Sequence, residues 1–217
     1  VENLSVIGFV SDNYNKILSE LQRNKIYPLL LSQIASAGRV NIVVTGNQTE
    51  ITKNIIETEI YGKPKTVHLA LIGHGNVGGT LVEQILDSAY DILKRKRVDL
   101  KIVAIANSKK IAFNKAGFGS DWRQKIKYST TDSSVDSLVD FAKEHHLENL
   151  VMVDNTASKD FVKHYPTFVD NGFDIVGSNK IYNTLPISEY RNFRKLLEKN
   201  KKKYLYETNV GAGLPLS

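Results

Sequence analysis

The sequence predicts an α/β protein in which a doubly wound parallel sheet follows a small α+β unit. Three observations support this fold class. From residue 67 onward, strand and helix patterns alternate strictly, which is typical of a parallel sheet covered by helices on both faces. A glycine-rich turn separates the first strand from the first helix of that series. Before residue 62 the order is instead strand, helix, strand, strand, helix, which is most of a split β-α-β unit.

The small unit is expected to cover residues 1–62 and to be incomplete by one strand. Asp12 is the predicted N-cap of its first helix, in which apolar side chains recur at helical spacing. Gly62-Lys63-Pro64-Lys65 interrupts the pattern and is interpreted as a linker. The predicted strands are 4–10, 28–35 and 39–45, and the predicted helices are 14–23 and 49–60.

The second domain is expected to cover residues 63–217. A loop-rich stretch around Gly117 and Gly119 is the one long interruption of its alternating pattern. The predicted strands are 67–72, 100–106, 150–153, 174–176 and 204–207, and the predicted helices are 77–94, 135–145, 159–171 and 187–199.

Composition narrows the class of protein. The 217 residues include no cysteine, which excludes disulfides and thiolate metal sites and favours a cytoplasmic setting. No apolar stretch is long enough to span a membrane. The net charge of +6 comes largely from Lys94–Arg97 and Lys199–Lys203, at the ends of two predicted helices, where cations complement the helix dipole. We therefore expect solvated surface runs, with no nucleic-acid or membrane partner.

The glycine-rich turn reads Gly73-His74-Gly75-Asn76-Val77-Gly78 and matches G-x-G-x-x-G between a strand and a helix. In that context Gly73 permits a tight turn, Gly75 lets the backbone approach a pyrophosphate, and Gly78 lets helix and strand pack closely. Asn76 and Val77 place backbone N–H groups at the helix N-terminus, which favours phosphate. The motif predicts a Rossmann-type dinucleotide-binding domain.

The residues after the second strand bear on the choice of cofactor. An acidic residue that would bind a ribose 2′-hydroxyl is missing, because the strand runs into Asn107, Ser108, Lys109 and Lys110. Amide, hydroxyl and ammonium groups can hold a 2′-phosphate, which a carboxylate would repel. We predict NADP(H) over NAD(H); the alternative is that these lysines only solvate a loop.

Two further segments follow strands and should lie at the carboxyl edge of the sheet, where doubly wound folds bind ligands. The first is 154–158, Asp-Asn-Thr-Ala-Ser, in which Ser158 could equally be a helix N-cap. The second is 177–180, Gly-Ser-Asn-Lys, which places Lys180 at the same edge, although a surface lysine is the simpler interpretation.

The segment 206–215, Tyr-Glu-Thr-Asn-Val-Gly-Ala-Gly-Leu-Pro, follows the last predicted strand. Its two glycines permit a turn in which several carbonyl oxygens point inward, an arrangement that hard cations use. From the residues alone, a cation site in this segment is only one possibility.

Together and in this order, these motifs resemble homoserine dehydrogenase over residues 65–217, and the 206–215 segment is specific to that family. The first 62 residues resemble the second ACT region of aspartokinase. The whole chain resembles the junction of a bifunctional aspartokinase/homoserine dehydrogenase.

The resemblance implies reversible hydride transfer from NAD(P)H to aspartate 4-semialdehyde, giving homoserine for threonine and methionine synthesis. It places Thr156, Ala157 and Ser158 along the nicotinamide ribose. It implies that Lys180, between cofactor and substrate, is the catalytic residue, because an ammonium group can polarise the carbonyl or deliver a proton. The family's substrate and monovalent-cation positions, with a cation such as sodium, fall on Glu207 and the carbonyls of Val210, Ala212 and Leu214.

The small unit departs from the ACT pattern. Gln33 stands at the position linked with effector binding, but the preceding residues are Lys-Ile-Tyr-Pro at 25–28 and the following loop, 34–37, has no acidic residue. Threonine binding and a purely structural or dimer-forming role therefore both stay open. The resemblance implies a homo-oligomer in the full-length protein.

Two alternatives to the enzyme interpretation remain. One is a regulatory module that senses an amino acid and NADPH without catalysis, and the other is a different NADPH-dependent dehydrogenase that shares the cofactor fold. Because the chain starts at Val1 without methionine and stops at Ser217 after a Gly-Ala-Gly loop, we expect it to be a fragment that binds cofactor but does not turn over.

Overall fold

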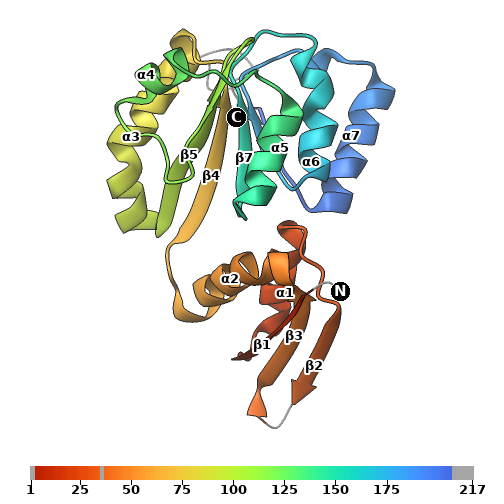
Figure 1. The fold of residues 1–217 in the computed structure, drawn as a ribbon. Coiled ribbons are helices and arrows are strands. Elements are labelled where there is room, and N and C mark those ends of the chain that lie inside the picture. Colours follow the sequence, from red (N-terminus) through yellow and green to blue (C-terminus); the bar gives the residue numbers. More distant parts are fainter. Residues whose placement is uncertain (1–2, 35–36, 207–217) are drawn as a thin grey trace.

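The structure, a computed structural model, describes residues 3–34 and 37–206, and these residues form two sheets (Figure 1). The smaller sheet has three antiparallel strands, and the larger has six strands. Gly62, in the left-handed conformation with φ 60°, ends the last helix of the smaller unit, and the first strand of the larger sheet begins at Lys65.

The smaller sheet buries one face against two helices. Val40, Ile42 and Val44 alternate along its central strand and are fully buried against Ile17 and Ile55 of these helices. The strand order is β1-β3-β2, and a fourth strand is not seen among the described residues. The elements are β1 (Leu4–Val10), α1 (Tyr14–Arg23), β2 (Leu30–Ile34), β3 (Arg39–Thr45), the short 3-10 helix η2 (Gly46–Gln48) and α2 (Thr49–Tyr61).

The predicted cap of α1 at Asp12 is wrong. The residue that precedes the helix is Asn13, and its side chain makes no capping hydrogen bond. Its backbone N–H instead donates to Ser11 Oγ at 3.1 Å, so a local turn sets the entry to α1.

The larger sheet confirms the predicted doubly wound fold. Its strand order is β6-β5-β4-β7-β8-β9, and all neighbours are parallel except β6, which pairs antiparallel with β5. The direction of strand progression reverses between β4 and β7, where ligands bind in open α/β sheets. The strands are β4 (Lys65–Ile72), β5 (Val98–Ala106), β6 (Ile111–Phe113), β7 (Leu150–Asp154), β8 (Asp174–Gly177) and β9 (Tyr204–Leu205).

Helices cover both faces of this sheet (Figure 1). The α3 and α4 helices pack on one face, where Val82 and Trp122 contact Leu71 and Ile105. The other helices pack on the opposite face. The helices are α3 (Asn76–Lys96), α4 (Trp122–Lys127), α5 (Val135–Glu144), η3 (Phe161–His164), α6 (Tyr165–Asp170), η4 (Tyr182–Thr184) and α7 (Ile187–Asn200).

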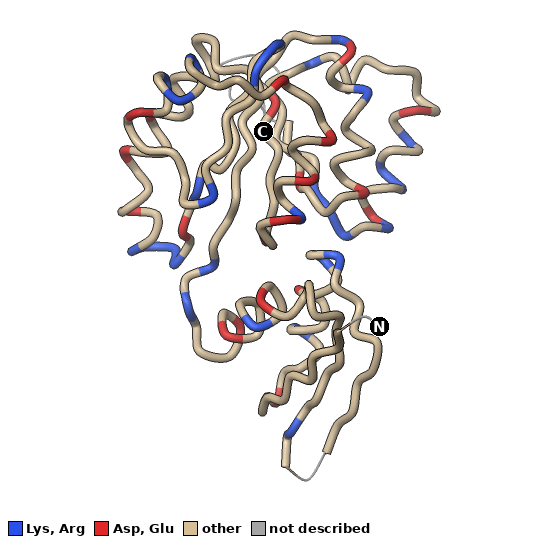
Figure 2. Tube along the Cα trace, in the orientation of Figure 1, with Lys and Arg blue, Asp and Glu red and all other residues tan. Residues whose placement is uncertain are grey.

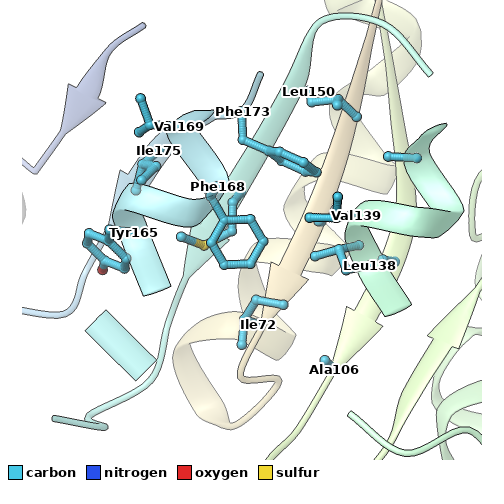
Figure 3. Packing of buried hydrophobic residues seen from close by; sticks show 14 of the residues in the cluster. Ile72, Ala106, Leu138, Val139, Leu150, Tyr165, Phe168, Val169, Phe173 and Ile175 are labelled. Carbon is cyan, nitrogen blue, oxygen red and sulfur yellow. The ribbon is translucent and has the colours of Figure 1, made fainter. Parts of the chain in front are cut away.

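The core on that second face is rich in aromatic side chains. Figure 3 shows Phe168 from α6 and Leu138 from α5 lying over Ile72 at the end of β4. Tyr165 stacks on Tyr182 with ring centroids 4.9 Å apart. Because this packing ends at the carboxyl edge of the sheet, the loops at that edge have a rigid base.

Two differences from the predicted elements have local causes. The stretch around Gly117 contains β6 and α4, with three and six residues, which are too short to give a periodic pattern. The predicted helix 159–171 is divided into η3 and α6, and Pro166 lies in the first turn of α6, where its missing N–H is tolerated.

One basic run differs from the expected solvated surface. Lys94–Lys96 form the last turn of α3, as predicted. Lys202, however, is 6% exposed and places Nζ 3.9 Å from Asp174 Oδ2. In the part of the chain that the structure describes, no helix combines the length and apolarity needed to cross a membrane.

The two units meet through the C-terminal end of α1. Arg23 Nη2 lies 3.2 Å from Asp174 Oδ2 at the start of β8, and Glu20 Oε2 lies 2.6 Å from Lys65 Nζ at the start of β4. Asn149 N, just before β7, donates to Asn24 Oδ1 at 2.7 Å. The smaller unit is thus bonded to the amino edge of the larger sheet, opposite the edge with the glycine turn.

Candidate functional site

Three turns leave the larger sheet side by side at its carboxyl edge. Gly73 N donates to Ala106 O at 2.8 Å, Asn155 N to Ile72 O at 2.8 Å, and Ser178 N to Asp154 O at 2.9 Å. Each turn after a strand is therefore tied to the end of the neighbouring strand. This ladder brings the glycine turn, the 154–158 segment and the 177–180 segment together, as the sequence predicted.

The glycine turn requires glycine at its two ends. Gly73 has φ 85°, and a Cβ there would lie 3.0 Å from the backbone of Asn155. A Cβ on Gly78 would lie 1.8 Å from Gly73 O, so the first turn of α3 could not approach β4 with any other residue.

Gly75 has a different environment. A Cβ at this position would meet no atom within 4 Å, and the residue is the N-cap of α3 with ordinary extended backbone. No side chain caps the helix, and its first turn has no acidic residue. Unpaired N–H groups and the positive end of the helix dipole therefore face open space at Gly75, which fits the pyrophosphate of a dinucleotide.

A cavity of about 620 Å³ lies beside the glycine turn on the α5–α6 face. Ile72 lines it at the end of β4, with Asn107 and Ser108 from the loop after β5. Thr156, Ala157 and Ser158 line the same cavity. The structure thus brings together Asn107 and Ser108, which the residues after the second strand assigned to a 2′-phosphate, and the 156–158 residues, which the resemblance assigned to the nicotinamide ribose.

The loop after β5 is ordered by its own amide side chain. Asn107 Oδ1 accepts hydrogen bonds from the backbone N–H groups of Lys109 and Lys110, both at 2.8 Å. Its Nδ2 lies 3.3 Å from His74 Nε2, which connects the loop to the glycine turn. Lys110 Nζ is bound by Asp132 at 2.7 Å, whereas Ser108 and Lys109 are exposed. Lys109 does not line the cavity.

A second cavity, of about 560 Å³, lies on the α3 side. Asn76 and Val77 of α3 line it, together with Asn155 and Ser178 from the turns after β7 and β8. Because residues 73–75 connect Ile72 of the first cavity to Asn76 of the second, an extended ligand that crosses the glycine turn would reach both.

A buried polar network holds the turns after β7 and β8. Asp154, which is fully buried, accepts from Thr156 N at 2.7 Å, from Tyr165 OH at 2.8 Å and from Asn179 Nδ2 at 3.1 Å. Asn179 also donates to Ser158 O at 3.1 Å. Burial raises the pKa of Tyr165, and the neighbouring Asp154 raises it further, so the phenol stays a hydrogen-bond donor.

The sequence had not singled out Asp154, Asn179 or Tyr165 as site residues. The first two lie inside the segments that the sequence did indicate, directly after strands, and that position was the available signal. Tyr165 follows Asp154 by eleven residues and lies in a helix, so only the tertiary structure brings the two side chains together.

The remaining predicted site residues are dispersed. Lys180 is exposed, directly follows the anchored Asn179, and lines neither cavity. Gln33 lies on β2 of the smaller unit, away from the site. Glu207, Val210, Ala212 and Leu214 lie outside the described residues. Within residues 3–34 and 37–206 there is no group of three or more His, Asp or Glu side chains placed to hold a metal ion.

Comparisons with known proteins agree with this geometry. Residues 73–207 match the family described as "Homoserine dehydrogenase, NAD binding domain". The chain is 36% identical, over 99% of its length, to a bifunctional aspartokinase/homoserine dehydrogenase of Buchnera aphidicola, and 31% identical over its whole length to the one of Haemophilus influenzae. It spans 27% of the length of each of these relatives.

The fold is also similar to a hyperthermophilic archaeal homoserine dehydrogenase solved in complex with NADPH. The TM-score is 0.54 at 22% identity, over 70% of this chain and 46% of the other. At that identity the likeness concerns the fold.

Proposed function

Because the chain belongs to the homoserine dehydrogenase NAD-binding domain family, we propose that it is the cofactor-binding part of a bifunctional aspartokinase/homoserine dehydrogenase. The proposed reaction is reversible hydride transfer between NAD(P)H and the aldehyde carbon of aspartate 4-semialdehyde, which gives homoserine for threonine and methionine synthesis. The open space at Gly75, before the uncapped N-terminus of α3, is the observation that carries the proposal.

The chain's own residues would bind and orient the dinucleotide. The backbone N–H groups of Asn76 and Val77 would hold the pyrophosphate, because both residues lie in the first turn of α3. Thr156 and Ser158 would contact a ribose from the cavity that they line. NAD(P)H, when bound, supplies the hydride.

Lys180 is the proposed catalytic residue. An ammonium group beside the substrate carbonyl would stabilise the charge that develops on oxygen and would hold the proton that this oxygen takes up. The preceding Asn179 supports this role, since its bonds to Asp154 and Ser158 fix the start of the loop while Lys180 itself remains exposed. Because Asn179 is held in place, the flexible side chain of Lys180 extends from a fixed point of the backbone.

A preference for NADPH over NADH is part of the proposal. No carboxylate follows β5, and Ser108 and Lys109 are exposed beside the cavity that Asn107 and Ser108 line. A hydroxyl and an ammonium group favour a 2′-phosphate at this position.

Two further roles are proposed from the family resemblance. Glu207 would contact substrate and, with the carbonyls of Val210, Ala212 and Leu214, hold a monovalent cation such as sodium. The cation site is tested by measuring how the activity of the full-length protein depends on sodium concentration. Glu207→Ala should abolish that dependence. Gln33, exposed on β2, would contact threonine as effector in a homo-oligomeric full-length protein.

Substitution of Gly75 tests the cofactor site. Gly75→Ala should leave the fold unchanged because the new methyl group meets no atom, yet it would occupy the path of the pyrophosphate. We expect NADPH affinity, measured by fluorescence titration, to fall about tenfold or more, as for loss of a charge-assisted contact. The matched control is Gly119→Ala, whose methyl would have Asp121 Oδ1 at 3.8 Å as its nearest neighbour. Equal affinity in both variants would exclude a dinucleotide at Gly75.

Cofactor preference and catalysis need separate measurements. Lys109→Gln should weaken NADPH binding but not NADH binding, whereas Lys195→Gln, an exposed change on α7, should alter neither. In the full-length protein, Lys180→Ala should lower the kcat of homoserine-dependent NADP⁺ reduction by about 100-fold or more while cofactor affinity changes little. A protein that binds NADPH but shows no homoserine-dependent reduction would refute the enzyme proposal and leave a sensor.

A further inference from the structure

The side chain of His74 connects the glycine turn to the loop after β5. His74 is the second residue of the turn and is partly buried. Its Nε2 lies 3.3 Å from Nδ2 of Asn107, which begins the 107–110 loop. The backbone already joins the two segments, because Gly73 N donates to Ala106 O at 2.8 Å, and the side chains add a second link. The G-x-G-x-x-G pattern leaves this position open, so it does not account for a histidine here.

The direction of the hydrogen bond between His74 and Asn107 is fixed by the rest of the loop. Asn107 Oδ1 accepts from the backbone N–H groups of Lys109 and Lys110, both at 2.8 Å. If the amide were turned over, its NH₂ group would face two N–H donors, so the oxygen must lie on that side. Nδ2 is therefore the donor toward His74. The imidazole accepts at Nε2 and carries its proton on Nδ1.

The imidazole ring of His74 has a rigid neighbour. It contacts the Trp122 indole in an edge-to-face arrangement, with ring centroids 5.9 Å apart and an interplanar angle of 74°. Trp122 is 1% exposed and belongs to the core that α3 and α4 form with the sheet. The guanidinium of Arg123 lies 4.4 Å from the centroid of the same indole and pairs with Glu83 of α3 at 2.6 Å. The acceptor atom of His74 is thus presented from a fixed ring.

The far side of the 107–110 loop is anchored to the segment before α5. Lys110 Nζ lies 2.7 Å from Asp132 Oδ1, and Ser133 N donates to Lys109 O at 2.9 Å. Ser108 and Lys109 lie between this anchor and the glycine turn, and both are exposed. The link to His74 therefore helps to set where these two side chains stand relative to the turn.

The position of these side chains matters because charge alone does not mark a phosphate site at this edge. Figure 2 shows basic and acidic residues close together along the edge of the larger sheet opposite the smaller unit. The attraction between an ammonium group and a phosphate weakens with distance and with exposure to water. Lys109 can discriminate between cofactors only if the loop holds it beside the ribose.

We propose that His74 is a positioning residue for cofactor discrimination: by accepting from Asn107, it holds the loop where Ser108 and Lys109 meet a 2′-phosphate. The inference rests on the proposed NADPH site. His74 acts through Asn107 and makes no contact with the phosphate. Without the acceptor, the Asn107 amide would lose this partner and the loop would settle in another position, at the expense of the phosphate contacts. NADH has no 2′-phosphate and would bind as before.

Fluorescence titration of the 217-residue chain with NADPH and with NADH tests the proposal. His74→Phe removes the acceptor and keeps an aromatic ring against Trp122. We expect the affinity for NADPH to fall about fivefold, the size of one lost hydrogen bond, while the affinity for NADH is unchanged, which also shows that the variant is folded. His74→Gln, whose amide oxygen can accept in place of Nε2, should restore most of the preference. An equal loss for both cofactors, or no loss for either, would overturn the proposal.

A double-mutant cycle separates positioning from direct contact with the phosphate. Lys109→Gln removes the charge that the loop presents, so His74→Phe in that background should lower NADPH affinity about twofold at most. A full fivefold loss in both backgrounds would mean that His74 acts independently of the loop, which would refute the proposal. The exposed control Lys195→Gln should change neither affinity.

The same titrations distinguish this inference from the proposed function. If the parent chain binds neither cofactor, the dinucleotide site itself is refuted, and the role of His74 is refuted with it. If the parent chain binds NADPH more tightly than NADH and His74→Phe keeps that ratio, only the role of His74 is refuted.

Discussion

Replacing Glu148 with glutamine should make the stability of the chain less dependent on pH. Burial raises the pKa of the Glu148 carboxyl from its ordinary 4.5 to about 7, although Lys65 and Lys101 act in the opposite direction. Because the folded chain holds this proton more tightly than the unfolded chain, stability falls as pH rises from about 4.5 to about 7 and is then constant. Glutamine has the shape of the protonated carboxyl and stays neutral.

The size of the effect follows from that pKa. At about 1.4 kcal/mol for each pH unit, the ionised carboxylate destabilises the native chain by about 3 kcal/mol above pH ~7, and by little near pH ~5. Glu148→Gln should therefore be more stable than the parent by up to about 3 kcal/mol at pH ~8, and the gain should shrink to below about 1 kcal/mol near pH ~5. This magnitude is an upper bound, because water can enter a cavity that is open to the junction.

Urea unfolding followed by circular dichroism at several pH values measures the gain directly. The matched control is Glu198→Gln, an exposed side chain on α7, which reports what the loss of any surface carboxylate does. A gain that is the same at pH ~5 and pH ~8, or a variant that is less stable at pH ~8, would refute the reasoning that Glu148 is buried without a partner.

Three other substitutions test the packing that positions the site. Gly78→Ala should destabilise the chain by about 3 kcal/mol or more in urea unfolding, because its methyl would overlap Gly73 O; a loss below about 0.5 kcal/mol would contradict that contact. Asp154→Ala should cost about 3 kcal/mol and weaken NADPH binding, since it leaves the buried Tyr165 hydroxyl without its acceptor and removes one of the acceptors of the Asn179 amide. Lys202→Met should be neutral or stabilising by about 1 kcal/mol at pH ~7, because burial lowers the pKa of this ammonium to about 8. A large loss of thermal stability in that variant would show instead that the ion pair with Asp174 stabilises the junction.

The two ends of the glycine turn were predictable because the glycine at each end is required by local steric constraints. Gly73 has a positive φ and Gly78 touches a backbone only five residues away, so both constraints are contained in one short segment. The carboxyl-edge segments were predictable for a related reason, since loops after parallel strands meet at one edge whatever the intervening helices are.

The polar network and the junction were not predictable in this way. Asp154 meets Asn179 across twenty-five residues, and Arg23 meets Asp174 across 151 residues. No local pattern marks such partners, because the distance between them is set by how the sheet and helices pack. Glu148 is similar, since nothing in the sequence around it indicates that α2 will cover it and leave one oxygen unbonded.

The two edges of the larger sheet are joined by the strands that carry the site. The β4 strand begins at Lys65, which Glu20 of α1 holds, and ends at the glycine turn eight residues later. The β8 strand begins at Asp174, which Arg23 of α1 holds, and ends after four residues at the turn that contains Asn179. At about 3.3 Å per residue, the contact of α1 with the start of β4 lies about 26 Å from the site, and its contact with the start of β8 lies about 13 Å from the site. Both strands are bonded to β7 between them, so the strands that α1 contacts at one edge belong to the same packed sheet that carries the dinucleotide site at the other edge.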